Sequence, residues 1–452
     1  MYAQANMISK VSNPAFVLHD HSPEDVARAT ILGLQKEPFF IFDMDEAYRR
    51  IQYFKHKLPR VQIFYAMKAN DGELMLKLAV ATGLGFDCAS IHEIHKILRL
   101  NVPPTDIIYA VTMKTPEQMM YARQSGVKRA TFDSPSELVK LKEYWPDVEL
   151  LLRISVKSDS VYQLGIKFGC NFETEATDLL DKAACMGLRV AGVAFHVGST
   201  CLSPESYLKA LQQARYLFDY EAKAGRTMRI LDIGGGFFCD DNLFEQATSV
   251  IRKGLDELFP GPNVQIVAEP GRYICETACN LYCNINNVKT ITKNDKPLNM
   301  VYINDGLHGS LRSFEKWHTI HKFELETTKH EELEDTILWG PTSDPRDCLT
   351  EVQLPRCTPR DWLVFKTQGA YASTFSSKFC GFGLVQTRFL ISFDLWNKIK
   401  SHKVFRPSDF VIQPDVSSPL QSTMPPVVPA ESCKHTNLNT LIDYLTSDMY
   451  NH

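Results

Sequence analysis

The 452-residue sequence lacks several features, and each absence excludes a class of protein. No apolar run approaches the roughly 20 residues that a membrane-spanning helix needs, and the first residues lack the apolar stretch of a secretory signal. The basic residues are dispersed and the formal net charge is −4, so we expect neither nucleic acid nor a membrane surface as a partner. The twelve cysteines show no metal-ligand spacing and no CxxC pair. We therefore expect no bound metal, and free thiols in the cytoplasm.

The length of the chain predicts two domains, because one hydrophobic core rarely serves 452 residues. Over residues 38–275, short apolar runs alternate with amphipathic stretches of helical length. Continuous apolar runs are typical of parallel strands that are buried on both faces. About eight such units fit a (β/α)8 TIM barrel, and an open doubly wound sheet is the alternative. We predict a barrel domain over residues 38–275.

After residue 275 the pattern changes, because strand-like runs follow one another without regular helices between them. This pattern predicts a mainly antiparallel β-sandwich domain over residues 276–405, to which residues 1–37 contribute. Residues 406–452 begin with a stretch rich in proline and serine. We interpret them as a linker or disordered tail with a short amphipathic helix near its end.

Polar residues follow the apolar runs of the predicted barrel, at the carboxyl end of each run. Seven runs show them: Lys68, Asp87, Asp133, Arg153, His196 with Ser199, Gly234–Gly236, and Glu269 with Arg272. In a parallel barrel these ends meet at one face, where active sites form. One polar residue at a strand end is more often a cap or a solvated side chain, but seven strand ends with such residues favour a shared site.

The types of these residues indicate a ligand with a phosphate group and a planar ring. The glycines at 234–236 let backbone N–H groups approach a phosphate, although a triple glycine alone is more often a tight turn. Lys68 follows an apolar run, where burial is expected to lower the ammonium pKa as carbonyl binding requires. Glu269 can hold a protonated ring nitrogen, and His196 can stack on the ring. We expect a cofactor that is bound to Lys68 through a carbonyl group.

Eight motifs, in the following order, resemble the eukaryotic ornithine decarboxylase family: FYAMKAN, GFDCAS, AFHVGS, LDIGGGF, AEPGR, INDGLHGS, WGPTSD and GAY. These are group IV, fold-type III pyridoxal phosphate (PLP) decarboxylases, and the resemblance runs from about residue 35 to residue 395. It implies an alanine-racemase-like barrel with a β-sandwich domain, and a homodimer with active sites shared across the interface. The segment around Ser343 and Asp344 would then reach into the partner's barrel.

The resemblance also assigns the cofactor site residue by residue. Lys68 resembles the lysine that binds PLP as a Schiff base, Glu269 the partner of the pyridine nitrogen, and His196 the residue stacked on the ring. Asp87 and Arg153 match family residues close to the lysine and the ring's O3′. The residues that match the phosphate site are Ser199, Gly235, Gly236, Arg272 and Tyr371, and Gly271 is a further cofactor-binding residue.

The substrate side departs from the family's pattern at two positions. The family's WGPxCD motif carries a cysteine that returns a proton to Cα, and here WGPTSD places Ser343 there. A hydroxyl is a far weaker acid than a thiol, whose pKa is about 8.5, so abortive transamination should compete. Trp317, nine residues after His308, replaces the aspartate that binds the distal ammonium, unless an alignment shift brings Glu315 to that place. Asp344, the other carboxylate for the distal amine, is retained.

These exchanges predict an altered choice of substrate. Replacing a carboxylate by an indole removes an ion pair, and a buried ammonium left poorly paired costs several kcal/mol. The indole also adds apolar surface, worth about 25 cal/mol per Å² buried. We therefore expect PLP-dependent decarboxylation of an L-amino acid to a primary amine and CO2, with an uncharged, leucine-like side chain preferred over ornithine.

Three alternatives stay open. One is a catalytically weak regulator of polyamine metabolism, similar to the antizyme inhibitors, with antizyme as a possible partner. Another is a genuine ornithine or lysine decarboxylase. A third keeps PLP but ends in transamination or oxidation, because protonation at Cα is handicapped.

Overall fold

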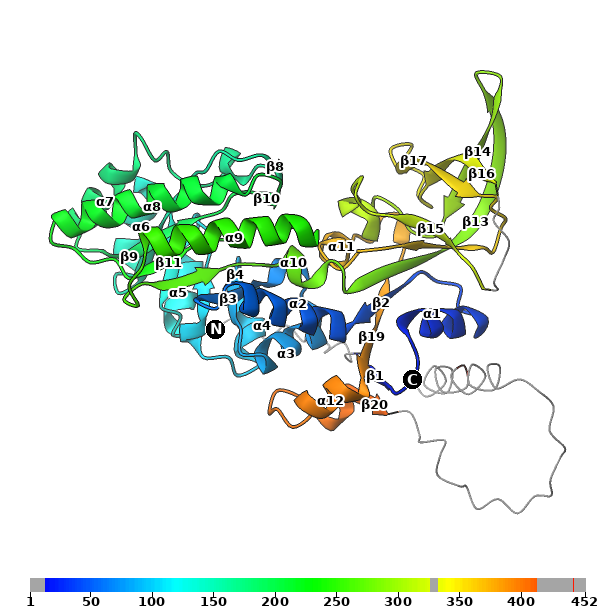
Figure 1. Ribbon diagram of the computed structural model, residues 1–452, viewed down its shortest axis with the longest axis horizontal. Coiled ribbons are helices and arrows are strands. Elements are labelled where there is room, and N and C mark those ends of the chain that lie inside the picture. Colours follow the sequence, from blue (N-terminus) through cyan, green and yellow to red (C-terminus); the bar gives the residue numbers. More distant parts are fainter. Residues whose placement is uncertain (1–12, 326–331, 413–441, 443–452) are drawn as a thin grey trace, which may run out of the picture. The chain divides into compact units, whose positions relative to one another are not determined.

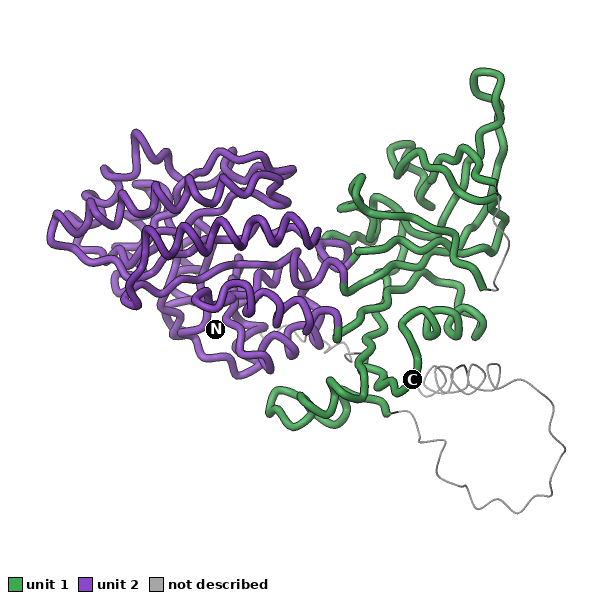
Figure 2. The backbone as a smooth tube through the Cα atoms, in the orientation of Figure 1, with its two compact units in different colours: residues 1–45, 278–368, 375–452 green, residues 46–277, 369–374 purple. Residues whose placement is uncertain are grey.

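The computed structural model describes residues 13–325, 332–412 and 442, which form two compact units (Figure 2). Unit 2 comprises Glu46–Thr277 and Gly369–Thr374. Unit 1 comprises the described residues of Met1–Asp45, Ala278–Gln368 and Phe375–His452. The chain therefore starts in unit 1, builds unit 2 and returns to unit 1, except that the short segment 369–374 belongs to unit 2.

Unit 2 is a closed barrel of eight parallel strands. The strands are β3 (Val61–Ala66), β4 (Gly85–Cys88), β5 (Ile107–Tyr109), β6 (Arg129–Phe132), β7 (Glu149–Ile154), β9 (Arg189–Phe195), β11 (Ile230–Asp232) and β12 (Gln265–Ala268). The barrel closes because β12 pairs with both β11 and β3. Nearly all strand residues are buried, as expected for strands with a packed interior on one side and helices on the other. The predicted barrel is confirmed.

Helices alternate with the barrel strands along the chain, beginning with a helix before the first strand (Figure 1). They are α2 (Met44–Lys57), α3 (Glu73–Ala81), α4 (Ile91–Leu98), α5 (Pro116–Gln124), α6 (Pro135–Tyr144), α7 (Ala176–Cys185), α8 (Glu205–Lys223), α9 (Asp241–Leu258) and α10 (Arg272–Cys275). Several begin at a capping residue: the side chains of Ser90, Thr115 and Ser134 each accept a hydrogen bond from the backbone three residues ahead. These caps end the polar loops at the carboxyl side of the strands, and so fix where the site residues lie. Between β7 and α8, β8 (Ser160–Tyr162) pairs with β10 (Ser199–Cys201).

Unit 1 contains a ten-stranded sheet. Its strands are β1 (Ala15–Leu18), β2 (Phe39–Asp43), β13 (Cys279–Lys293), β14 (Lys296–Ile303), β15 (Ile320–Phe323), β16 (Leu333–Trp339), β17 (Cys348–Pro355), β18 (Trp362–Phe365), β19 (Gln386–Ser392) and β20 (Phe410–Ile412). Antiparallel pairs such as β13–β14 and β16–β17 occur beside parallel pairs such as β14–β16 and β2–β19. The domain is therefore mainly β, as predicted, but its sheet is mixed.

The core of unit 1 lies where helix α1 (Pro23–Leu32) packs on this sheet. Phe39 stacks on Tyr282 with ring centroids 5.0 Å apart, and Trp362 lies next to Phe39 at 5.6 Å. The long β13–β14 hairpin turns at Asn294 and Asp295, which both have positive φ, as the favoured two-residue hairpin turn requires (Figure 1). A second helix, α12 (Phe393–Ile399), follows β19.

The structure differs from the sequence analysis at two boundaries. The apolar run at 39–43, grouped with the barrel in the sequence, is β2 of the unit 1 sheet, paired with β13 and β19. A strand buried on both faces has the same apolar pattern in either domain, so the pattern did not separate them. Residues 410–412, grouped with the tail, pair with β1. The remaining tail, including the predicted terminal helix, lies outside the described residues except for residue 442.

In the described ranges, no helix is long and apolar enough to cross a membrane. The same ranges hold no group of three or more His, Cys, Asp or Glu side chains suited to a metal ion. The eleven cysteines within them are free thiols.

Candidate functional site

Lys68 lies directly after β3, in a short 3-10 turn (Met67–Ala69). Its ammonium forms an ion pair with Asp87 of β4, whose side chain is 1% exposed, against 39% for Lys68. Burial lowers the pKa of Lys68, but the carboxylates of Asp87 and Glu269 outweigh burial and raise it above the usual value. The direction is opposite to the sequence-based expectation, because the neighbouring strands supply negative charge.

Glu269 follows β12 and is buried beside Asp232, the last residue of β11. Burial and the negative charges of Asp232 and Asp87 raise the pKa of Glu269 well above its usual value. Burial likewise raises the pKa of Asp232 to about 6. The buried Oδ1 of Asp87 accepts no hydrogen bond from the described residues. Asp87, Asp232 and Glu269 thus form a buried group of carboxyls, two of which act on Lys68, and a cationic ring N–H placed beside Glu269 would relieve their repulsion.

His196 follows β9, and its Nδ1 accepts a hydrogen bond from the Gly198 N–H at 3.0 Å. Burial and the positive charges of Arg153 and Lys68 hold the pKa of His196 well below its usual value. The imidazole is therefore neutral, with its proton on Nε2. A Cβ added at Gly235 would lie 2.9 Å from His196 Nε2, so the ring edge faces the glycine loop.

The loop Gly234–Gly236 follows β11 and leaves no room for side chains. Gly236 has a φ of +103°, and a Cβ there would lie 2.6 Å from the carbonyl oxygen of Gly198. A Cβ at Gly235 would meet the carbonyl oxygen of Glu269 at 2.9 Å. Gly271 is similarly crowded by Ala69 at 2.8 Å. Backbone this close to its neighbours forms the kind of concave, N–H-lined surface that binds phosphate.

Ser199, Arg272 and Tyr371 lie together next to this loop. Arg272 donates from Nε to Ser199 Oγ at 3.2 Å, and its Nη1 pairs with the buried Glu276 at 2.6 Å. The Arg272 guanidinium lies 5.1 Å from the centre of the Tyr371 ring. Tyr371 has a positive φ, and its N–H donates to the carbonyl oxygen of Ala69 at 2.7 Å. This bond explains why the segment 369–374 belongs to unit 2.

Two further strand-end residues have local partners. Arg153, in β7, has its guanidinium 5.1 Å from the ring centre of Phe168. Asp133 accepts a hydrogen bond from the Gly169 N–H at 2.8 Å. Asp133 therefore fixes a loop, which is the structural role that a single strand-end aspartate usually has.

The predicted substrate residues all belong to unit 1. His308 lies after β14, and its Nε2 is 2.8 Å from Asp344 Oδ2, in the loop between β16 and β17. The His308 ring packs on Phe379 with centroids 4.6 Å apart. Ser343 Oγ lies 3.7 Å from Cys380 Sγ. Trp317 packs edge-on against the ring of His318.

Asp347 connects the two loops that carry these residues. Its side chain is buried and accepts hydrogen bonds from the N–H of Leu307 at 2.7 Å and from Thr342 Oγ1 at 2.7 Å. The loops at 305–310 and 340–347 are thereby fixed side by side. We did not identify Asp347, Cys380 or Arg346 from the sequence. The only signal was the short run DPRD after Ser343, which contains Arg346 and Asp347.

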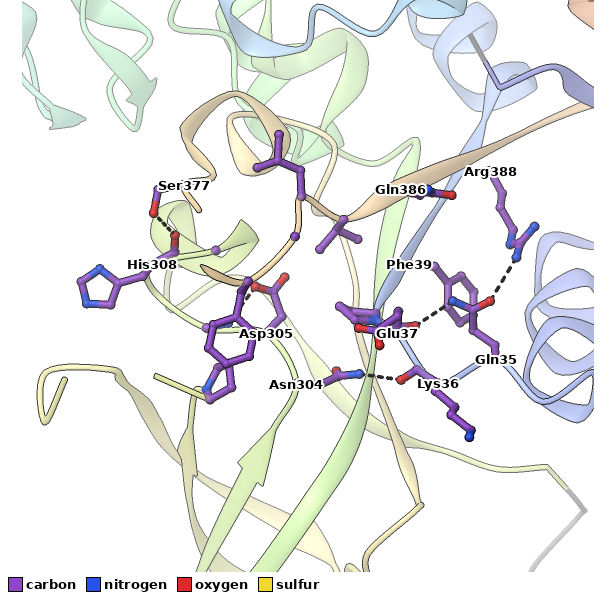
Figure 3. A pocket seen from close by; sticks show the side chains of 18 of the residues that line it. Gln35, Lys36, Glu37, Phe39, Asn304, Asp305, His308, Ser377, Gln386 and Arg388 are labelled. Carbon is purple, nitrogen blue, oxygen red and sulfur yellow. Dashed lines mark hydrogen bonds between the residues drawn. The ribbon is translucent and has the colours of Figure 1, made fainter. Parts of the chain in front are cut away.

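A cleft of about 1250 Å³ lies within unit 1 beside these loops. Figure 3 shows His308 and Ser377 on one side of the cleft, and Gln35, Glu37 and Arg388 on the other. The Ser377 hydroxyl donates to the carbonyl oxygen of His308 at 2.7 Å.

The end of the barrel fits PLP on three structural grounds. A lysine is next to buried carboxylates with an orphaned acceptor atom on Asp87. A neutral imidazole, that of His196, lies close enough to Lys68 for the ammonium to lower its pKa. A glycine loop that a Cβ would fill adjoins Ser199 and Arg272, donors suited to a phosphate.

Comparisons with known proteins agree with this geometry. Residues 44–276 match the family described as pyridoxal-dependent decarboxylase, pyridoxal binding domain. Ornithine decarboxylase of Neurospora crassa is 40% identical over 385 residues, which cover 77% of this chain and 79% of that protein. Ornithine decarboxylase of Panagrellus redivivus is 40% identical over 384 residues, covering 81% of this chain and 88% of that protein.

A solved structure is also similar. The arginine decarboxylase of Paramecium bursaria Chlorella virus, bound to agmatine, has a TM-score of 0.76 and 33% identity, covering 81% of this chain and all of that one. Barrel, cofactor-binding end and sequence relatives lead to the same assignment. The chain belongs to the family of pyridoxal-dependent decarboxylases that includes the ornithine decarboxylases.

Proposed function

We propose that this decarboxylase acts on an L-amino acid with an uncharged aliphatic side chain, leucine-like rather than ornithine-like, and releases a primary amine and CO2. The observation that carries this proposal is the contact between His308 Nε2 and Asp344 Oδ2, at 2.8 Å. Asp344 is the one retained carboxylate for a distal ammonium, and this contact already satisfies one of its oxygens. With Trp317 in place of the second carboxylate, the ammonium of ornithine would lose its hydration without adequate pairing.

The cofactor residues have distinct roles in this proposal. When bound, PLP withdraws electrons from Cα, which makes loss of the carboxyl group as CO2 possible. Lys68 anchors the cofactor, and Asp87 balances its charge. When the cofactor is bound, Glu269 would pair with the ring nitrogen, and the neutral His196 would contact the ring. Arg153 would contact the ring oxygen, and the residues that would hold the phosphate are Ser199, Gly235, Gly236, Gly271, Arg272 and Tyr371.

Loss of CO2 leaves an electron pair at Cα, and a nearby acid must supply a proton. The Ser343 hydroxyl is too weak an acid to do this well, but the Cys380 Sγ lies 3.7 Å from it. A thiol is a far stronger acid than an aliphatic hydroxyl. We infer that the pair delivers the proton, with Cys380 as the acid and Ser343 orienting it.

In this proposal unit 1 of one subunit completes the barrel site of a second copy in a homodimer. The segment that follows residues 369–374 supports such a contact, because several of its large apolar side chains are exposed. The exposed fractions are 51% for Phe375, 44% for Phe379, 42% for Phe382 and 40% for Leu384. Exposed apolar residues that cluster in this way are typical of interaction surfaces. We expect analytical ultracentrifugation to show a dimer for the wild type and weaker dimerisation for Phe379→Lys. Binding to antizyme stays a prediction.

A substrate panel tests the proposed function. The purified holoenzyme is offered leucine, valine, methionine, ornithine and lysine, and CO2 and amine are measured. An unpaired ammonium costing about 3 kcal/mol predicts a kcat/KM for leucine about 100-fold above that for ornithine. Lys68→Ala, which should lose both activity and the visible absorption of bound cofactor, controls for contaminating enzymes. Faster decarboxylation of ornithine than of leucine would refute the proposal.

A further inference from the structure

The carboxylate of Asp344 has a second partner, Arg346, two residues along the same loop. Arg346 donates from Nε to Asp344 Oδ1 at 3.0 Å and from Nη2 to Oδ2 at 2.8 Å. The Arg346 backbone N–H also donates to Oδ1 at 2.9 Å. With His308 on Oδ2, both carboxylate oxygens are occupied. The hydrogen bonds from Arg346 lower the pKa of Asp344, so this aspartate is ionised and its charge is already balanced.

The backbone determines this pairing. The Asp347 N–H donates to the Asp344 carbonyl oxygen at 3.0 Å, which closes a β-turn over residues 344–347. Pro345 occupies the second position of the turn, where its fixed φ is favoured. Asp347 then fixes the turn to the neighbouring loop through its bond with Leu307. Arg346 therefore starts from a preset position beside the carboxylate, and little side-chain freedom is lost on pairing.

Occupancy by a guanidinium has a consequence for other cations. The planar fork of arginine matches a carboxylate with two parallel bonds, a geometry that an ammonium group cannot reproduce. A substrate ammonium would have to displace Arg346 or approach a carboxylate with no net attraction left. The Asp344 side chain is 8% exposed, whereas that of Arg346 is 85% exposed. The arginine thus covers Asp344 from the solvent side.

We propose that Arg346 is an internal counter-ion for Asp344 that excludes amino acids with a distal ammonium group, and so determines the substrate class. This inference rests on the proposed function, since it requires that Asp344 and His308 face the substrate side chain. It goes beyond that function by assigning the exclusion to one residue. Removing the guanidinium should return to Asp344 its attraction for an ammonium.

The test compares full-length holoenzyme variants at this position with a matched control. Arg346→Met and Arg346→Gln remove the charge, Arg346→Lys keeps it, and Arg252→Met removes an exposed arginine of α9. The ratio of kcat/KM for ornithine to that for leucine should rise about 5- to 10-fold in both charge-removing variants. It should rise less in Arg346→Lys and stay at the wild-type value in Arg252→Met.

A binding measurement gives a second readout that is independent of turnover. Calorimetric titration with the diamine 1,4-diaminobutane should show tighter binding to Arg346→Met than to wild type, while the monoamine 3-methylbutylamine should not discriminate between them. An unchanged diamine affinity and substrate ratio in both charge-removing variants would overturn the inference. If the wild type releases no CO2 from any amino acid, the proposed function fails, and the diamine titration still decides the role of Arg346.

Discussion

The ion pair between Lys68 and Asp87 gives a quantitative prediction about the reactivity of the lysine. Replacing Asp87 by Asn removes a negative charge in direct contact with the ammonium. A close pair is worth about 4 kcal/mol at an effective dielectric of 20 and about 1 kcal/mol in water. Because Lys68 is 39% exposed, we take an intermediate value of about 2 kcal/mol. The neutral amine of Lys68 should then be about 30-fold more populated at a given pH.

Chemical labelling measures this population directly. Apoprotein is treated briefly with a small amine-reactive ester, and labelling of Lys68 is quantified by mass spectrometry against the exposed Lys253, whose side chain is 79% accessible. Asp133→Asn is the matched control, because Asp133 also follows a barrel strand, β6, but accepts its hydrogen bond from the Gly169 backbone. Labelling of Lys68 should rise in Asp87→Asn alone. Equal labelling in wild type and Asp87→Asn would refute the electrostatic reasoning.

Three further predictions concern other parts of the site. Gly236 has a φ of +103°, so Gly236→Ala should lower the unfolding free energy by about 1–3 kcal/mol, measured by denaturant titration. The same variant should bind PLP more weakly, measured by cofactor absorbance. An unaltered PLP affinity would contradict the assignment of this glycine to the phosphate site. Ser343→Cys should raise the ratio of amine to transamination product, and Cys380→Ala should lower it, as measured by mass spectrometry of the products. An unchanged ratio in Cys380→Ala would exclude that thiol as the acid. His196 has a lowered pKa in the folded chain, so protonation of the unfolded chain should reduce stability as the pH falls below about 6.5. The loss of stability on lowering the pH should be smaller in His196→Gln than in the wild type, as measured by urea unfolding at two pH values. An equal loss in both proteins would contradict this prediction.

The barrel could be predicted because its pattern is local. Each strand is a short apolar run, and the polar residue that matters follows it directly, as Lys68 follows β3 and His196 follows β9. Parallel topology then brings these ends together without further information. The same locality explains the misplaced β2, since its apolar run carries no mark of the sheet that it joins.

What could not be predicted depends on contacts between distant parts of the chain. The raised pKa of Lys68 comes from carboxylates on β4 and after β12, so no property of its own segment reveals it. Cys380 meets Ser343 only because two loops of unit 1 fold together. Arg346 is near Asp344 in sequence, but the pairing of their side chains depends on the turn that the Asp347 N–H closes.

The segment 369–374, which returns to unit 2 and contacts Ala69 and Arg272 through Tyr371, has a consequence for biosynthesis. All eight barrel strands have been synthesised when Ala268 leaves the ribosome, but Tyr371 follows much later. At about 5–20 residues per second the delay is roughly 5–20 s. A nascent barrel can close during this interval, before Tyr371 is available to contact Ala69 and Arg272. We therefore expect the cofactor to bind only after Tyr371 has been synthesised, and a fragment that stops before residue 369 would contain the whole barrel without Tyr371.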